Sequence, residues 1–459
     1  MHNTPTQEQR YQMLTNQPVE KVIPKLAVPT IISMMVSSIY NTADTFFVSQ
    51  LGTSASGAVG IIFSAMAIIQ ALAFMIGMGS GNYMARCFGA GEREKGEQIA
   101  STGFFTGLIV GAFIVVIGLS NIESIVMLLG STETIKPYAV DYARYIFLAA
   151  PFMIGSFIMN NLLRLQGLAA YAMLGIASGG ILNIALDPIF IFGFHLGTAG
   201  AAIATGISQF ISFCILLAQC NFRKACVTIR FRNFAPSLSM YKSIIMGGLP
   251  SLGRQGMASL AAVILNLTAR PYGDAAIAAM AIVSRCSMLL NSAVIGFGQG
   301  FQPVCAFSFG AEKYGRVKNA FWFCVKVSSA FLLCISLVIF LFSGHVIEFF
   351  RKGDPEVIAI GTLALRLQIC TLPLGGFLAM SNMCTQSIGY GFRSTVLAMS
   401  RQGIFLIPIL LIASGSFGLL GIQMAQPIAD LCTFGLTVLI MFGTFRELKE
   451  LEAKGEVAK

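Results

Sequence analysis

The sequence predicts an all-α integral membrane protein, with twelve transmembrane helices in two parallel six-helix lobes around a central cavity. The first reason is composition: of 459 residues, 56% are hydrophobic and only 11% are charged, against roughly 25% charged residues in a soluble domain. The second is length, because the apolar runs reach the roughly 20 residues that cross a bilayer. The third is that the two halves of the chain repeat each other.

The first half of the chain predicts an N-lobe over residues 22–220. Its six helices are expected at 22–48, 56–84, 97–120, 138–162, 169–194 and 198–220. The breaks between them carry Gly, Pro and charged residues, which are typical of turns. An N-terminal tail, residues 1–21, precedes this lobe.

The second half predicts a C-lobe over residues 243–444, after a polar linker of residues 221–242. Its six helices are expected at 243–269, 276–305, 318–343, 357–384, 393–414 and 419–444. A C-terminal tail, residues 445–459, follows. None of the three polar stretches is long enough for a separate soluble domain.

An internal repeat appears when the second half of the sequence is laid over the first without gaps. In this ungapped register, Pro250 falls on Pro29, and the segment Phe309-Gly310-Ala311 falls on Phe88-Gly89-Ala90. Each repeat has an even number of helices, so the two halves share one orientation in the membrane. Parallel repeats with a binding site at their interface are a common transporter design.

Lysine and arginine gather in alternate loops, and this accounts for the net charge of +10 without a nucleic-acid partner. Positive residues are retained on the cytoplasmic side, so both tails and the linker are expected in the cytoplasm. The opposite loops hold little beyond Lys136, Arg270, Arg351 and Lys352. The first apolar run is too long for a cleaved signal peptide. We therefore expect a multi-pass protein of the cell (plasma or inner) membrane.

Two carboxylates are expected inside the N-lobe, where a charged side chain near the bilayer centre costs about 2.5–3.5 kcal/mol. Asp44 lies in the helix expected at 22–48, and Asp187 lies in the helix expected at 169–194. Asn183 precedes Asp187 by four residues, and Tyr40 precedes Asp44 by four, so each pair shares a helix face. The alternative is that both acids lie at helix ends, in water, without a role.

Pro188 adds to the chemistry of this segment. It cannot donate a backbone hydrogen bond, and its ring crowds the carbonyl group of Ile184. That carbonyl is then free for an ion, a water molecule or a neighbour. A buried carboxyl group favours the proton, and a nearby cation favours the carboxylate. The acids and their polar neighbours therefore predict a proton or sodium site.

The predicted spans also contain basic side chains, one further acid and a pair of prolines. Basic side chains near helix ends extend to the interface, and this is expected for Arg144, Arg254, Arg285, Lys326, Arg366 and Arg401. Asp430 could pair with one of them. The repeat-equivalent prolines, Pro29 and Pro250, are expected to bend their helices and so to serve in gating.

Several enzyme signatures are missing from the sequence. It contains no GxxxxGK[ST] loop for ATP, no HExxH and no dinucleotide fingerprint. None of the eleven cysteines forms a CxxC or a Cys/His cluster. We therefore expect no enzyme activity, no cofactor, no disulfide and no metal site, apart from sodium as a coupling ion.

The sequence resembles the multidrug and toxic compound extrusion (MATE) family over essentially its whole length. The resemblance rests on two parallel halves of six helices, on Phe88-Gly89-Ala90-Gly91-Glu92, and on its echo Phe309-Gly310-Ala311-Glu312. It is greatest for the DinF-like branch. In that branch, a cavity of the N-lobe gathers residues that correspond to Asp44, Asn183, Asp187 and Thr205, and Tyr40 and Pro29 also fit.

The resemblance implies further expectations about this site. Tyr40, Ser37 and Asn160 are expected to line a substrate cavity, and Pro188 is expected to act with Pro29 and Pro250 in gating. The NorM-like branch has acids in its seventh and tenth helices, and the corresponding apolar spans contain none. This difference favours coupling through the N-lobe.

The function implied by the resemblance is an antiporter that exports amphipathic, often cationic, compounds in exchange for protons or sodium, and we expect it to act as a monomer. Proton and sodium stay open as the coupling ion. The alternative is a flippase for a lipid-linked precursor, from the same superfamily. A receptor or membrane enzyme would not explain the duplication. A standard twelve-helix facilitator would carry GxxxDRxGRR, which the loop after residue 84 lacks.

Overall fold

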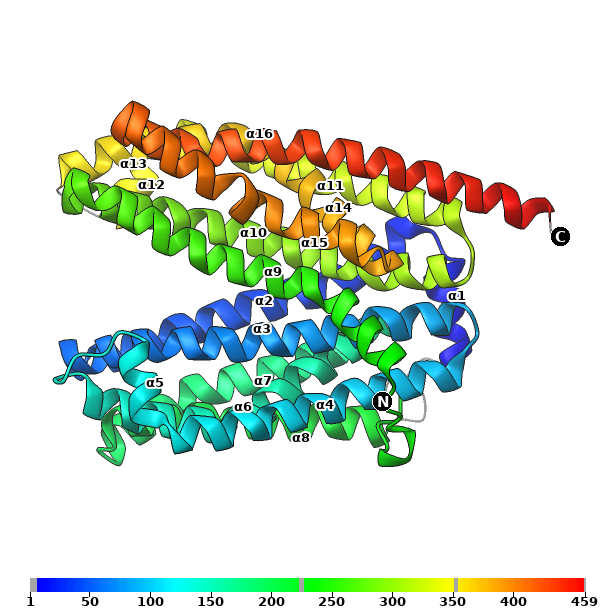
Figure 1. The fold of residues 1–459 in the computed structure, drawn as a ribbon, viewed down its shortest axis with the longest axis horizontal. Coiled ribbons are helices and arrows are strands. Elements are labelled where there is room, and N and C mark those ends of the chain that lie inside the picture. Colours follow the sequence, from blue (N-terminus) through cyan, green and yellow to red (C-terminus); the bar gives the residue numbers. More distant parts are fainter. Residues whose placement is uncertain (1–5, 223–226, 351–353, 458–459) are drawn as a thin grey trace.

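The computed structural model describes residues 6–222, 227–350 and 354–457. This part of the chain consists of helices joined by short loops, with no strand, and the long helices run side by side along the longest axis (Figure 1). The first half contains two short helices, α1 (Gln7–Thr15) and α5 (Ile122–Leu128). Its long helices are α2 (Val19–Ser49), α3 (Thr53–Gly89), α4 (Arg93–Ser120), α6 (Lys136–Leu165), α7 (Ala169–Pro188) with the π-helical turn η1 (Ile189–Gly193), and α8 (Gly197–Phe222).

The second half has a similar order of helices, with one short 3₁₀ turn before its first helix and another after it. The turns are η2 (Phe231–Asn233), before α9, and η3 (Arg270–Tyr272), after it. Its helices are α9 (Leu238–Ala269), α10 (Gly273–Gly310), α11 (Tyr314–Leu341), α12 (Ser343–Phe350), α13 (Pro355–Thr371), α14 (Leu374–Ile388), α15 (Gly391–Met399) with the π-helical turn η4 (Ser400–Ile404), and α16 (Leu406–Val457).

The helices confirm a multi-span membrane fold. In the described residues, nine are long and apolar enough to cross a membrane, or ten if the bent pair α13–α14 is one span. One of these stretches, Gly391–Lys454, contains α15 and most of α16, and Gly418 interrupts it with φ 59° and ψ −136°. α9 is not among the nine, and it carries Arg254 and Gln255 in its middle. Hydropathy therefore does not fix the number of spans at twelve.

Some predicted elements differ from the structure. The single helix expected at 357–384 is two helices, α13 and α14, bent by 55°. Pro373 lies at the break and cannot donate a backbone hydrogen bond. The expected N-terminal tail contains α1, because Thr6 and Gln9 form a capping box that satisfies its first amides. The expected C-terminal tail continues α16 as far as Val457.

The two halves form two bundles, which Figure 1 shows one above the other. Helix α1 and the last turns of α16 lie at one end of the molecule, together with the turns after α3 and α10 (Figure 1). We call this the basic end, because these segments carry Arg93, Lys95, Lys313 and Arg316. The connections from α2 to α3 and from α9 to α10 lie at the opposite end.

At the basic end the two lobes are in backbone contact. A Cβ atom on Gly89 of α3 would lie 2.3 Å from the carbonyl oxygen of Phe307 in α10. A Cβ atom on Gly310 of α10 would lie 2.0 Å from the carbonyl oxygen of Arg86 in α3. The ungapped register of the repeat relates Gly89 to Gly310 and Arg86 to Phe307. The two contacts are therefore equivalent under the internal repeat, and only glycine allows either of them.

Helix α1 also joins the lobes at the basic end. The Leu14 side chain is fully buried and packs against Gly167, in the turn between α6 and α7. The Arg316 side chain, from the start of α11, donates hydrogen bonds to the carbonyl oxygens of Leu14 (3.1 Å) and Gln17 (2.5 Å). Lys313 donates to the carbonyl oxygen of Thr15 at 3.4 Å. The C-terminal carbonyls of α1 thus meet cations of the other lobe.

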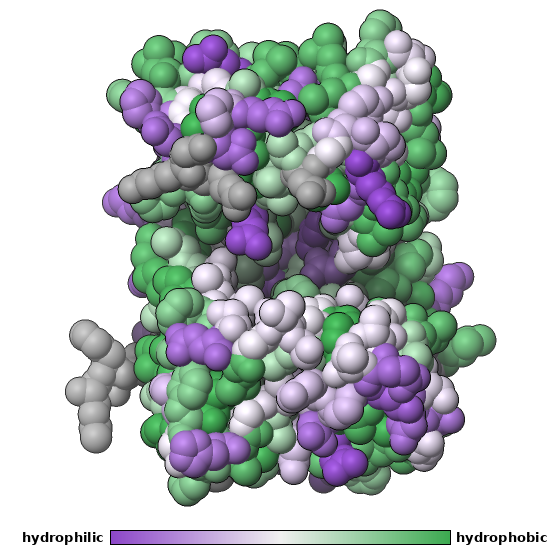
Figure 2. Space-filling view, turned by 90° about the vertical axis from the view of Figure 1, so that its left-hand side faces the viewer, coloured by the Kyte–Doolittle hydropathy of each residue, from purple (hydrophilic) through white to green (hydrophobic). Residues whose placement is uncertain are grey.

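At the opposite end the lobes are apart. Figure 2 shows this face, with a hollow between the upper and the lower half and hydrophilic residues deep inside it. The molecule is therefore closed at the basic end and open at the other, as expected for one state of a two-lobe transporter.

Candidate functional site

The predicted acid site forms where α7 meets α8. Asp187 is fully buried, and Asn183 and Thr205 are exposed by only 2% and 4%. The amide nitrogen of Asn183 donates to Oδ1 of Asp187 at 3.1 Å and to Oγ1 of Thr205 at 3.2 Å. Three of the predicted residues are thus joined by hydrogen bonds. Asp187 lies at the end of α7, as the alternative expected, but it is buried and not in water.

Asp44 approaches this group from α2. It is half-buried, and its Oδ2 accepts a long hydrogen bond of 3.4 Å from the hydroxyl group of Tyr142 in α6. Its charge also lies close enough to interact with Asp187 and with Tyr40. Helices α2, α6, α7 and α8 therefore all contribute to one site. We call Asp44, Asn183, Asp187 and Thr205 the acid cluster.

The acid cluster has unused acceptor atoms. Oδ1 of Asp44, Oδ2 of Asp187 and Oδ1 of Asn183 are buried without a hydrogen-bond partner among the described residues. Buried polar atoms without partners are rare in folded proteins, because each costs free energy. A proton, or a hard cation that prefers oxygen ligands, would satisfy such acceptor atoms. In residues 6–222, 227–350 and 354–457, no group of three His, Cys, Asp or Glu side chains could hold a metal ion.

A small cavity of about 10 Å³ lies beside the cluster. Ser37 and Tyr40 of α2 line it, together with Asn183, Thr205 and Gln209. Such a volume is about that of one water molecule, so this cavity suits an ion or water rather than a drug. The hollow between the lobes is the larger space (Figure 2).

The glycines of α7 create the room for this cavity. A Cβ atom on Gly180 would lie 3.1 Å from the Tyr40 ring and from the side chain of Val36. The remaining predicted cavity residue, Asn160, is not among the lining residues. Its amide group instead donates to the carbonyl oxygen of Ala172 at 3.0 Å, which ties α6 to α7.

Two of the three predicted gating prolines lie inside helices, and the third lies at a helix end. Pro29 and Pro250 are inside the continuous helices α2 and α9, and the Ser33 hydroxyl group donates to the carbonyl oxygen of Pro29 at 3.0 Å. Pro188 ends α7, and the π-helical turn η1 follows directly. A gating role for these prolines stays a prediction.

The C-lobe contains a second buried carboxylate, Asp430 of α16, and it pairs with one of the predicted arginines. Nε and Nη2 of Arg401 donate to its two oxygens at 2.8 and 3.2 Å. Thr371 and Gln426 donate to them at 3.2 and 2.8 Å. The expected pairing is thus confirmed, and both carboxylate oxygens are occupied.

Four other predicted cations also lie in the C-lobe, and one of them is Lys326 of α11, which is exposed. Arg254 donates to Oδ1 of Asn382 at 3.4 Å. Arg366 donates to the Ser343 hydroxyl group at 2.8 Å and lies over the Phe340 ring. Arg285 is exposed.

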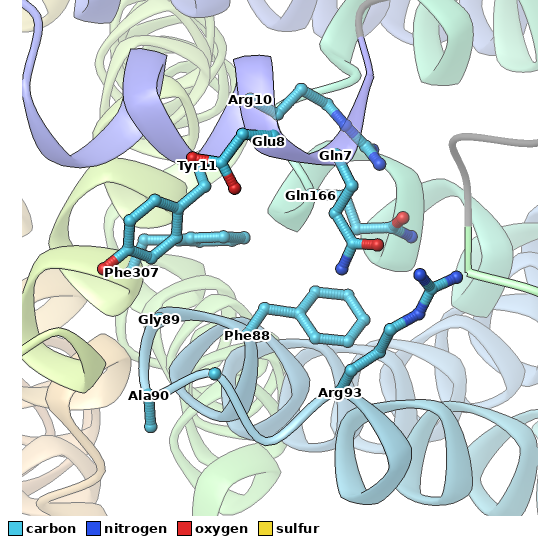
Figure 3. A pocket seen from close by; sticks show the side chains of 11 residues that line it. Gln7, Glu8, Arg10, Tyr11, Phe88, Gly89, Ala90, Arg93, Gln166 and Phe307 are labelled. Atoms are coloured by element: carbon cyan, nitrogen blue, oxygen red, sulfur yellow. The ribbon is translucent and has the colours of Figure 1, made fainter.

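A larger pocket, of about 540 Å³, lies at the basic end between α1 and the ends of α3 and α10 (Figure 3). Figure 3 shows Glu8 and Arg10 of α1 on one side, and Phe88 and Arg93 on the other. Its lining residues are Gln7, Glu8, Arg10, Tyr11, Phe88, Gly89, Ala90, Gly91, Arg93, Gln166 and Phe307. No residue of the acid cluster lines it, so it is a separate feature of the closed end.

Sequence reasoning missed two residues of the site. Tyr142 lies near the start of α6, and its hydroxyl group is directed at Asp44. A lone tyrosine in an apolar helix gives little signal. Gln209 had a clearer signal, because the register of the internal repeat places it on Asp430.

The chain matches the MatE family model over residues 29–189 and again over residues 250–412. It is 28% identical to a multidrug export protein MepA of Staphylococcus haemolyticus, over 92% of this chain and 93% of that protein. It is also 28% identical to a MepA of Staphylococcus aureus, over 92% of this chain and 94% of that one.

Solved structures agree with the fold. A multidrug resistance MATE family transporter in an outward-facing conformation superposes with a TM-score of 0.89 at 28% identity, over 98% of this chain and all of that one. A transporter of the same superfamily from Pyrococcus furiosus, described as having a binding pocket of reversed polarity, gives 0.88 at 29% identity over the same shares. Two matches to one family model, one in each half, also agree with the internal repeat. The chain belongs to the MATE family of multi-pass membrane transporters.

Proposed function

We propose that this chain is a cation-coupled antiporter that exports amphipathic, often cationic, drugs or toxic compounds across the cell (plasma or inner) membrane by alternating access. The similar proteins from Staphylococcus are multidrug export proteins by name. The observation that carries the coupling is the acid cluster with its three unpartnered oxygens. The basic end is the cytoplasmic side in this proposal, because lysine and arginine concentrate there.

The proposed cycle uses the two lobes and the acid cluster together. In the state described, the hollow faces the outside, and a proton or sodium ion reaches Asp44 and Asp187 from it. Binding there neutralises the acids and satisfies the open acceptor atoms, and the substrate leaves outward. The lobes then close at the opposite end and part at the basic end. The cation leaves to the cytoplasm, and a new substrate enters.

The driving force is sufficient without ATP. One inward positive charge at about 150 mV yields roughly 3.5 kcal/mol. For an uncharged substrate exchanged against one cation, this sustains roughly a 300-fold gradient. A cationic substrate carries its own charge outward and depends correspondingly more on the chemical gradient of the coupling ion.

The test is efflux of ethidium from cells that express the wild type, Asp187→Asn or the double variant Asp44→Asn, Asp187→Asn. The proton and sodium gradients are collapsed separately. Efflux that depends on one gradient and on the acids would establish the antiporter and its ion. Undiminished, gradient-driven efflux by the double variant would contradict it. No efflux by a well-inserted wild type would direct attention to flipping of lipid-linked precursors.

A further inference from the structure

Arg164, near the end of α6, is a buried cation at the boundary of the lobes, and the coupling mechanism does not use it. Its side chain is one of the largest fully buried groups in the described residues, with 2% of the residue exposed. Nη1 donates to the carbonyl oxygen of Gln299 and to Oε1 of Gln302, both at 2.9 Å. Both acceptors belong to α10, in the other lobe.

The partners of Arg164 within its own lobe are few. Nη2 donates to Oδ1 of Asn161 at 2.7 Å and lies 3.0 Å from the sulfur of Met78. Nε has no partner, and no carboxylate pairs with the guanidinium group, among the described residues. The positive charge is therefore stabilised by neutral acceptors alone, and two of the three strongest come from across the boundary.

The hydrogen bonds continue into the C-lobe. The amide group of Gln302 donates to Oε1 of Gln386 in α14 at 3.5 Å. Gln386 in turn donates to the carbonyl oxygen of Gly247 at 2.9 Å and to the Ser251 hydroxyl group at 3.0 Å, both in α9. Arg164 is thus connected to three helices of the C-lobe.

The internal repeat explains why there is one such arginine. Met78 and Gln299 occupy equivalent positions in the two repeats, and both contact the same guanidinium group. Arg164 therefore lies close to the axis that relates the lobes. Its repeat counterpart is Thr385, which is buried and donates only within α14.

Separation of the lobes at the basic end would remove the acceptors of α10. A buried charge without partners is strongly disfavoured, so the lobes can part only as water reaches Arg164. The closed state supplies charge-assisted hydrogen bonds, which are stronger than neutral ones. We propose that Arg164 holds the cytoplasmic side of the transporter closed through Gln299 and Gln302, and that its release from α10 is a step of the transport cycle. This inference rests on the proposed function for its cycle, although the closure itself can be measured without transport.

The test compares amide hydrogen exchange of the purified full chain in lipid nanodiscs, without any gradient. The variants are Arg164→Met, Arg164→Lys and, from the other lobe, Gln302→Leu. Arg366→Met is the matched control, because it removes a cation whose partners, Ser343 and Phe340, lie within the C-lobe. The reporting segments are 79–91 of α3 and 299–311 of α10.

Arg164→Met and Gln302→Leu should both accelerate exchange in these segments about tenfold, because one charge-assisted hydrogen bond corresponds to at least about that factor. Arg164→Lys should give a smaller change, since one ammonium group cannot serve all the acceptors. The control should match the wild type. Ethidium efflux measured in parallel should fall with Arg164→Met and recover in part with Arg164→Lys.

Unchanged exchange in both Arg164→Met and Gln302→Leu, with the variants folded, would overturn the proposal. If Arg164→Met does not fold, Gln302→Leu decides, because in that variant Arg164 keeps its hydrogen bonds to Gln299 and Asn161. Faster exchange at the basic end combined with a wild type that exports nothing would reject the proposed function and leave this closure standing.

Discussion

The two lobes hold their buried carboxylates in opposite conditions. In the N-lobe, Asp44 and Asp187 each keep one buried oxygen without a partner among the described residues. In the C-lobe, Asp430 has both oxygens occupied, and Arg401 alone donates two hydrogen bonds to it. The N-lobe therefore has acceptor atoms available for an incoming cation, whereas the carboxylate of the C-lobe is already paired with the guanidinium group of Arg401.

The internal repeat shows which N-lobe residues correspond to the ion pair of the C-lobe. The counterpart of Arg401 in the first repeat is Gly180, and the counterpart of Asp430 is Gln209. Gly180 and Gln209 both line the small cavity beside the acid cluster. Where the C-lobe has a fixed guanidinium group, the N-lobe thus has a space of about 10 Å³. The two positions that form an ion pair in the C-lobe thus line the small cavity beside the acid cluster in the N-lobe.

The largest effect is expected from Asp187→Asn. The amide keeps an oxygen for the hydrogen bond from Asn183 but can neither bind a proton nor neutralise a cation. Gradient-driven efflux should fall to the level of cells without the protein, while the free energy of unfolding changes by less than about 1 kcal/mol. Asp141→Asn, an exposed acid on α6, is the control. Coupled efflux by Asp187→Asn would show that coupling does not need this N-lobe acid, and it would contradict the contrast drawn between the lobes.

Substitutions of the C-lobe ion pair should change the stability of the protein and not its ion coupling. Asp430→Asn leaves Arg401 without a counter-charge, and breaking a buried pair in this way costs about 3 kcal/mol. The double variant Arg401→Met, Asp430→Leu removes both charges and should recover most of that loss, as seen by thermal unfolding in detergent. Both proteins should keep the ion dependence of the wild type. A changed coupling ion or stoichiometry in either would show that the C-lobe takes part.

A smaller effect is expected from Thr205→Val, which keeps the shape of the side chain. It removes the oxygen that accepts from Asn183 at 3.2 Å, and one such hydrogen bond is worth about 1 kcal/mol. The coupling-ion concentration for half-maximal efflux should therefore rise about fivefold. Thr433→Val is the C-lobe control, because the hydroxyl group of this buried threonine donates only to the backbone of Ala429 in its own helix. Equal shifts in the two variants would argue against a local role for Thr205.

The smallest effect is expected from Tyr142→Phe. Its hydrogen bond to Asp44 is long, at 3.4 Å, so its loss should cost about 0.5 kcal/mol. The coupling-ion dependence should shift about twofold, with Tyr138→Phe, an exposed tyrosine on the same helix, as the reference. A shift as large as that of Thr205→Val would place Tyr142 in the acid cluster itself.

The sequence predicted the parts of this molecule that depend on local pattern. Apolar runs and the repeat indicated the helices and the two lobes, and the four-residue spacing of Asn183 and Asp187 placed them on one face. The bend between α13 and α14 was missed, although Pro373 lies within the helix expected at 357–384. Apolar residues continue on both sides of Pro373, so hydropathy gives no sign of the break.

Contacts between distant helices could not be predicted in the same way. The sequence indicated that Asp430 would find a cation, but several arginines were available and only the fold selects Arg401. No role was predicted for Arg164, because the helix expected at 138–162 ends two residues before it. In the structure α6 runs to Leu165, and its last turn meets α10. Such pairings depend on how the lobes pack, which no local pattern encodes.

The paired glycines at the basic end have a practical consequence for isolating the other state of the protein. In the closed arrangement, a methyl group at Gly310 would fall 2.0 Å from a backbone oxygen, and one at Gly89 would fall 2.3 Å from another. Once the lobes separate, the same methyl groups face only water. An alanine at either position should therefore destabilise the closed conformation and leave the conformation with separated lobes unaffected. Antibodies selective for the form that is open at the basic end can be raised against such a protein.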